Sequence, residues 1–473
     1  MIYLKILEAI NRLVWGVPAL VLILGVGLYL TVGSKFAQFR LFPEAMRLFV
    51  RKLLFREGED KGVSQFQALC TALAATVGTG NIVGVAGAIA IGGPGAIFWM
   101  WICALFGMVT KYAEASLAQY YRQRGREGNY FGGPMYMIEY GMGHRWRWLG
   151  CIYCFFGVIA AFGIGNATQI NAVIDGLNSV LHVFGTEATM WRNLLFGTLF
   201  SVVLVMIQLG GAKRVGRLSE LLVPFVSVAY ILLCMGILIA RATQIPTALR
   251  AIVMGAFSPK AATGGVIGSA FTSLRVGASR GVFTNEAGMG TASMAHASAS
   301  VDHPAQQGLL GIVEVFLDTV VICTMTALAI LCSGVYIPFG VDEGFVLTER
   351  AFSSVYGDWV SIPLTLFLCC FAFATMLGWG LYGLRCAQYL FGDGAWRAFV
   401  LLQGVVIIVS TLLKTDAVWL LSETVNGLMA LPNLIALTVL MPRLKILTES
   451  FQKRSAHKER SRLVIHLQAL KDP

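Results

Sequence analysis

Apolar stretches long enough to cross a membrane recur along nearly the whole chain of 473 residues. A helix needs about 20 apolar residues to span a hydrocarbon core of roughly 30 Å. The stretches are continuous and lack the alternation of membrane strands, so we interpret them as helices. About eleven spans are predicted, at residues 14–32, 66–90, 96–119, 149–174, 193–210, 220–240, 263–295, 307–331, 359–384, 396–413 and 417–440.

Composition excludes the other broad classes. Hydrophobic residues make up 57% of the chain and charged residues only 13%, which is too apolar for a soluble protein of this length. Disordered and disulfide-stapled secreted folds are excluded as well, because the apolar runs are long and the ten cysteines are sparse. The predicted fold class is an all-α polytopic membrane protein embedded in a lipid bilayer.

The distribution of Lys and Arg predicts the orientation, since these residues favour cytoplasmic loops. With the N-terminus outside, 25 of the 36 fall on the cytoplasmic side, eight on the other side and three within spans. We therefore expect a multi-pass protein of the cytoplasmic (inner) membrane with a cytoplasmic C-terminus. The net charge of +11 is then a topology signal, so no nucleic-acid partner is predicted, and the basic tail is expected to be solvated.

Two spans contain polar, glycine-rich interruptions near their middles. The first break lies within residues 74–81 and the second within residues 279–288, so that Asn81 and Asn285 are 204 positions apart. Each broken span is the first of a set of five consecutive spans. Because five is an odd number, the second set crosses the membrane in the opposite direction to the first. This outline is typical of transporters with inverted repeats. Free backbone amides at such a break attract a carboxylate, while free carbonyls coordinate a cation.

The breaks also predict the domain organisation of the chain. Residues 1–62 form an extra N-terminal transmembrane helix and a cytoplasmic loop. Residues 63–240 and 263–440 form the first and second inverted repeats, each with five helices, and residues 441–473 form the basic tail.

Several motifs resemble the alanine or glycine:cation symporter family. Residues 92–101 read GGPGAIFWMW, which is similar to the family signature GGxGAxFWMW. Residues 79–81, 132–136, 280–288 and 377–379 also resemble the family. The resemblance implies a leucine-transporter-like fold of 5+5 inverted repeats plus one N-terminal helix, and a transporter that imports alanine or glycine with sodium by alternating access.

The resemblance also implies where the substrates bind. The backbone amides around Thr79 and Gly80 would receive the carboxylate of the amino acid, and Trp379 would cap its side-chain pocket. The rest of the site would be lined by Asn81, Gln169, Phe283 and Thr284. Sodium, the co-transported ion, would lie between the carbonyls of Ala74 and Val77 and the hydroxyl of Thr375.

Other functions remain as alternatives to this one. A proton could replace sodium, another small neutral amino acid could be carried, or the same fold could serve as a channel or sensor that does not concentrate substrate. An enzyme is not predicted: residues 277–281 match GxSxG, but the strand that must precede such a serine is missing from the pattern. The sequence assigns no oligomeric state.

Charged residues within spans are costly unless they are paired. We expect Arg275 and Arg280 to pair with carboxylates among Glu286, Glu314 and Asp318. His296 and His303 are expected to be solvated in a cytoplasmic loop.

Overall fold

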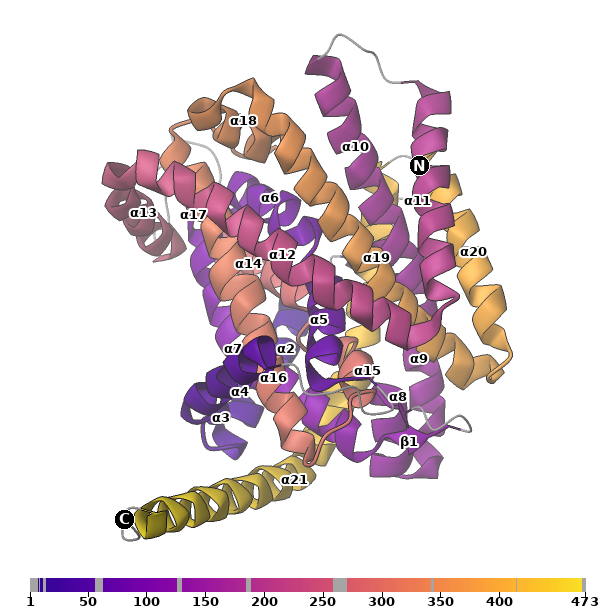
Figure 1. The fold of residues 1–473 in the computed structure, drawn as a ribbon. Coiled ribbons are helices and arrows are strands. Elements are labelled where there is room, and N and C mark those ends of the chain that lie inside the picture. Colours follow the sequence, from indigo (N-terminus) through magenta and orange to yellow (C-terminus); the bar gives the residue numbers. More distant parts are fainter. Residues whose placement is uncertain are drawn as a thin grey trace.

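The computed structural model describes residues 7, 9–11, 14–55, 63–125, 130–183, 189–257, 270–341, 344–413 and 415–469. This part of the chain is almost entirely helical (Figure 1). Its one sheet is a short hairpin in which β1 (Gln123–Arg124) pairs antiparallel with β2 (Tyr130–Phe131).

The helices, with the short 3-10 and π segments labelled η, have the following bounds: α2 (Val17–Gly33), α3 (Ala37–Arg40), α4 (Phe42–Leu54), α5 (Gln65–Thr76), η1 (Thr79–Asn81), α6 (Val83–Gly92), α7 (Gly95–Tyr120), α8 (Pro134–Tyr136), η2 (Met137–Met142), η3 (His144–Trp146), α9 (Arg147–Phe162), η4 (Gly163–Ala167), α10 (Thr168–Val183), α11 (Met190–Gln208), α12 (Gly211–Ala240), η5 (Ala242–Gln244), α13 (Ile245–Phe257), α14 (Ala270–Asn285), α15 (Ala292–Ala297), α16 (Pro304–Val315), η6 (Phe316–Cys323), α17 (Thr324–Ser333), α18 (Phe345–Tyr356), η7 (Asp358–Val360), α19 (Ser361–Phe391), α20 (Ala395–Ser410) and α21 (Thr415–Ala469).

The prediction of a polytopic helical membrane protein is confirmed. Within the described residues, seven continuous helical stretches are long and apolar enough to cross a membrane: Gly95–Tyr120, His144–His182, Met190–Gln208, Gly211–Ala240, Pro304–Ser333, Asp358–Phe391 and Leu420–Ser455. Shorter apolar helices cover Pro18–Gly33, Val83–Gly92 and Ala395–Ser410. Large apolar side chains on α11 and α12 are exposed, among them Leu199, Leu221, Phe225 and Ile239, as expected for a surface that faces lipid. The count of eleven stays a prediction.

The GGPG motif at residues 92–95 makes the sharp turn between α6 and α7. Gly93 has a φ of +72°, a conformation that favours glycine, and Pro94 precedes the first turn of α7. A side chain on Gly95 would lie 2.2 Å from the backbone of Gly255 in α13. The two glycines therefore serve a turn and a close approach between helices.

Both predicted breaks are present in the structure. The helix that begins at Gln65 stops at Thr76, turns through η1 and resumes as α6. The second break separates α14 from α15, and there Glu286 adopts a φ of +55°. The domain limits themselves stay a prediction, since residues 56–62 and 258–269, which include the start of the predicted second repeat, lie outside the described residues.

The C-terminal segment is more ordered than a solvated tail. Helix α21 continues past residue 440 and, in Figure 1, its yellow end runs out from the bundle. Before leaving the bundle it buries Leu444, Leu447 and Phe451, and Thr448 is hydrogen-bonded to Tyr112 of α7 at 2.9 Å. The expectation of a solvated tail is therefore wrong for the first part of residues 441–473, and residues 470–473 lie outside the described chain.

Candidate functional site

The first break exposes two backbone amides. After α5 ends at Thr76, the amide of Gly78 donates to Oδ1 of Asn81 at 2.9 Å, and the amide of Asn81 donates back to the carbonyl of Gly78 at 3.2 Å. Asn81 thus holds the tight turn of η1 in place. The amides of Thr79 and Gly80 have no hydrogen-bond acceptor in the described chain, so they can receive an anionic group.

The same turn leaves carbonyl groups free on the α5 side. The usual helical donor to the carbonyl of Ala74 is the amide of Gly78, which is bonded to Asn81 instead. The structure shows no donor among the described residues for the carbonyls of Ala74 and Val77. Thr375 of α19 faces this point: its buried hydroxyl has no hydrogen-bond partner among the residues that the structure describes, and a methyl group on Gly78 would lie 2.4 Å from it. These are oxygen donors suited to a small cation.

Helices from both repeats surround Thr79 and Gly80. A methyl group on Gly80 would lie 3.6 Å from Oγ1 of Thr284 and 3.8 Å from the ring of Phe283, both on α14. The hydroxyl of Thr79 donates to Oε1 of Gln169 on α10 at 3.1 Å. The structure therefore brings together these five residues, which the sequence predicted as one site.

Trp379 contacts the second break. Its indole Nε1 donates to Oε1 of Glu286 at 2.7 Å, and its side chain is buried. A methyl group on Gly165 in η4 would lie 2.4 Å from the Cβ of Trp379, so the indole is held tightly between η4 and the second break.

Hydrogen bonds link the two breaks through η6. Nδ2 of Asn81 donates to Oδ1 of Asp318 at 2.7 Å, and Oδ2 of Asp318 accepts from the hydroxyl of Thr319 at 2.8 Å. Nδ2 of Asn285, at the end of α14, donates to the same hydroxyl at 3.2 Å. The role of Asp318 was missed from sequence, although its position within an apolar span was a signal of a special function.

The amides at the second break are satisfied by the chain itself. Oε1 of Glu114, buried on α7, accepts from the amides of Gly288 at 2.9 Å and Gly290 at 3.1 Å, and from Nδ2 of Asn433 at 2.7 Å. The Asn433 amide also donates to the carbonyl of Gly288 at 2.9 Å. Sequence reasoning missed these two residues because their partners are distant along the chain.

An ionic cluster lies between α7, α15 and α16. Nζ of Lys111 is 3.1 Å from Oε1 of Glu314, and Nε2 of His296 is 2.9 Å from Oε2 of Glu314, with all three side chains fully buried. The expectation that His296 is solvated is wrong. It is buried because α15 folds back into the bundle after the second break.

The predicted pairing of Arg275 and Arg280 is also wrong. Arg280 lies 3.3 Å from Glu423 of α21, and in the described structure no ion pair joins Arg275 to any of the three proposed carboxylates. Those carboxylates have partners elsewhere, as described above. Packing of α21 against the bundle, which the spacing of residues does not reveal, decides this pairing.

His303 caps α16 and is not solvated. Its Nδ1 accepts from the amide of Ala305 at 3.2 Å, and its Nε2 lies 2.9 Å from the hydroxyl of Ser450 on α21. Burial, with the charge of Arg454 nearby, lowers the pKa of His303 below its ordinary value of 6.5. The neutral ring is therefore favoured in the folded protein.

Comparison with solved structures defines the class of the fold. The crystal structure of MhsT in complex with L-phenylalanine matches with a TM-score of 0.57 at 16% identity, over 83% of this chain and 99% of MhsT. Mhp1, a nucleobase-cation-symport-1 family transporter in a closed conformation with bromovinylhydantoin bound, matches with a TM-score of 0.52 at 11% identity, over 82% and 77%. The chain therefore has the leucine-transporter-like fold of inverted repeats.

The chain belongs to the sodium:alanine symporter family, whose family model matches residues 1–464. The sodium/alanine symporter AgcS of Methanococcus maripaludis is 40% identical over 93% of this chain and 95% of AgcS. The "Probable sodium/glutamine symporter GlnT" of Bacillus subtilis is 38% identical over 91% and 87%, and the amino-acid carrier protein AlsT of the same species is 37% identical over 89% and 86%. The protein is an integral membrane amino-acid transporter rather than an enzyme.

Proposed function

We propose that the protein imports alanine or glycine together with sodium by alternating access. The observation that carries this proposal is the first break, where the free amides of Thr79 and Gly80 lie within a few residues of the free carbonyls of Ala74 and Val77. Unpaired backbone groups at such a break are tolerated in a membrane only where protein, water or a ligand satisfies them. A zwitterion and a small cation together supply both kinds of partner.

The proposed amino-acid site is small and neutral. The carboxylate would accept hydrogen bonds from the amides of Thr79 and Gly80, beside the amide side chain of Gln169. Phe283 and Trp379 are buried and would limit the room for a side chain. Family members differ in the substrate that their names give, since AgcS is a sodium/alanine symporter and GlnT is described for glutamine, so the size limit needs a direct test.

The proposed sodium site uses the carbonyls of Ala74 and Val77 and the hydroxyl of Thr375. The unpaired, buried hydroxyl of Thr375 supports this assignment, because a buried polar atom without a partner is costly. Carbonyl groups at the end of a broken helix are the usual ligands of a coupling cation in transporters of this type. Sodium on one side of η1 and the carboxylate on the other would each favour the same conformation of the break, which couples their binding.

The decisive experiment is uptake of labelled alanine into proteoliposomes with and without an inward sodium gradient. We expect accumulation only with the gradient. Accumulation with a pH gradient alone would indicate proton coupling instead, and downhill flux without accumulation would indicate a channel. Labelled glycine and glutamine, measured in the same vesicles, would define the size limit of the pocket.

The sodium site has a matched pair of variants. Thr375→Val removes the hydroxyl at nearly constant shape, and Thr375→Ser keeps it. We expect the valine variant to need at least about tenfold more sodium for half-maximal uptake, which corresponds to about 1.4 kcal/mol, and the serine variant to remain near the parent. If the two variants show the same dependence of uptake on sodium, the hydroxyl of Thr375 is not a sodium ligand.

The membrane placement is proposed with the same function. We propose that the N-terminus lies outside and the C-terminus in the cytoplasm of the cytoplasmic membrane, on the charge distribution described above. Labelling of single cysteines placed at exposed positions on α21 and α18 with a membrane-impermeant reagent tests this: only α18 should react from outside intact cells.

A further inference from the structure

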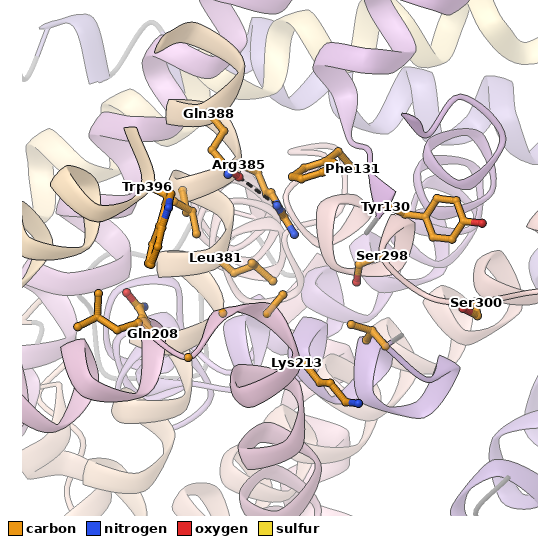
Figure 2. A pocket seen from close by; sticks show the side chains of 16 residues that line it. Tyr130, Phe131, Gln208, Lys213, Ser298, Ser300, Leu381, Arg385, Gln388 and Trp396 are labelled. Carbon is orange, nitrogen blue, oxygen red and sulfur yellow. Dashed lines mark hydrogen bonds between the residues drawn. The ribbon is translucent and has the colours of Figure 1, made fainter. Parts of the chain in front are cut away.

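A cavity of about 640 Å³ lies at one end of the bundle, next to the starts of α5 and α12 (Figure 2). Its volume is in the range of small-molecule sites. Its described lining contains two cationic side chains, Arg385 and Lys213, and no Asp or Glu. Its lining residues lie in or next to segments that the Lys and Arg distribution places in the cytoplasm, or in the cytoplasmic ends of the predicted spans 193–210 and 359–384.

Arg385 is the central feature of this cavity. Its side chain is 9% exposed, Nη1 donates to Oε1 of Gln388 at 3.0 Å, and Cζ lies 4.3 Å from the ring centroid of Phe131. Figure 2 shows the guanidinium directed into the cavity, between Gln388 and Ser298. No carboxylate of the described chain lies within ion-pair distance of it, although a buried arginine is normally paired.

Helix α19 contributes residues both to the cavity and to the proposed substrate and sodium sites. Arg385 follows Trp379 by six residues, which is about 9 Å of helix. Leu381 and Gln208 line the cavity, and Nε2 of Gln208 donates to the carbonyl of Met376, the residue after Thr375. A residue that lines the cavity is therefore hydrogen-bonded to the turn of α19 that adjoins the proposed sodium ligand.

We propose that Arg385, assisted by Lys213, binds the carboxylate of the transported amino acid on its way between the first break and the cytoplasm. The proposal rests on the proposed function. A guanidinium offers parallel N–H donors that match a carboxylate, and Phe131 and Gln388 hold that group in position. An amino acid that leaves the amides of Thr79 and Gly80 then meets a second carboxylate site before it reaches water.

The test measures binding of propionate, a carboxylate without an ammonium group, to the purified full-length protein in phosphatidylcholine nanodiscs by titration calorimetry. Arg385→Gln should weaken propionate binding at least about tenfold, and Lys213→Gln, at an exposed position, should weaken it less. Arg397→Gln is the matched control, because Arg397 is exposed and stacks on Trp396 without lining the cavity. It should bind like the parent. Asn81→Ala, which disrupts the first break, reports any propionate that binds at the amides of Thr79 and Gly80 instead.

The outcomes separate the two proposals. Propionate binding that survives in both Arg385→Gln and Lys213→Gln would overturn this inference, as would binding that is lost in Asn81→Ala. Inorganic phosphate is a second probe: binding as tight as that of propionate would overturn the assignment to the amino-acid carboxylate and indicate a phosphate or lipid headgroup. Propionate binding is measured without transport, so it can be interpreted even if sodium-driven uptake fails. Failure of the proposed function is thereby distinguished from failure of this site.

A transport measurement gives an independent readout. If Arg385 receives the substrate after the first break, Arg385→Gln should lower the maximal rate of alanine uptake severalfold while changing its external half-saturation concentration little. An unchanged rate in a variant that no longer binds propionate would overturn a role on the transport path.

Discussion

The side chain of Asn81 connects the first break to Asp318 through a hydrogen bond of 2.7 Å from Nδ2 to Oδ1. Its other side-chain atom, Oδ1, accepts from the amide of Gly78. One residue therefore shapes the turn that frees the amides of Thr79 and Gly80 and fixes that turn to η6. This division of its two polar atoms makes asparagine hard to replace.

The Asn81–Asp318 contact predicts a charge-swap result. Asn81→Asp should abolish alanine uptake, because two carboxylates would meet in a buried place. The double variant Asn81→Asp with Asp318→Asn restores one amide facing one carboxylate and should recover part of the uptake. Uptake by the double variant that is no better than by the single one would show that the hydrogen bond is not what matters.

The ion pair of Lys111 with Glu314 predicts a large effect on stability. Within the described structure, Lys111→Met leaves His296 as the remaining ion-pair partner of Glu314, and breaking a buried pair costs about 3–5 kcal/mol. The thermal midpoint in detergent should fall steeply. Adding Glu314→Leu to this variant removes the stranded charge and should recover stability, and a further fall would contradict the argument.

Two glycines near the first break predict opposite outcomes. Gly78→Ala would place a methyl group 2.4 Å from the hydroxyl of Thr375, while Gly84→Ala meets no atom within 4 Å. We expect Gly78→Ala to raise the sodium concentration for half-maximal uptake at least about tenfold, or to eliminate uptake, and Gly84→Ala to behave like the parent. If uptake by the two variants depends on sodium concentration in the same way, Gly78 does not adjoin the ion site.

The capping histidine predicts a dependence of stability on pH. Because the pKa of His303 is lowered in the folded protein, the unfolded chain binds this proton at higher pH, and stability is lost as the pH falls below about 6.5. His303→Asn keeps a capping side chain without a titrating group. Its thermal midpoint should fall less between pH 7.5 and pH 5.5 than that of the parent, and equal falls would exclude His303 as a source.

Much of the fold and of the candidate site could be predicted from the sequence, because the features that define them are local. Apolar runs indicate spans, and Gly78 and Gly80 beside polar residues indicate a break. The pairing of Arg280 with Glu423 and the burial of His296 could not be predicted, since they depend on how distant helices pack. The same reason explains why Glu114 and Asn433, both far in sequence from the second break, were missed.

The hydrogen bonds from Gly288 and Gly290 to Glu114 give the two repeats different chemistry. At the break of the second repeat, Glu114, which lies on α7 of the predicted first repeat, occupies the place that the substrate carboxylate would take at the first break. The two inverted repeats therefore share a fold, but their breaks differ. In the described chain the amides of Gly288 and Gly290 are hydrogen-bonded, and those of Thr79 and Gly80 are not. With the proposed function, we therefore expect the second break to stay filled by Glu114 and only the first break to bind and release substrate, which gives one amino acid per transport cycle.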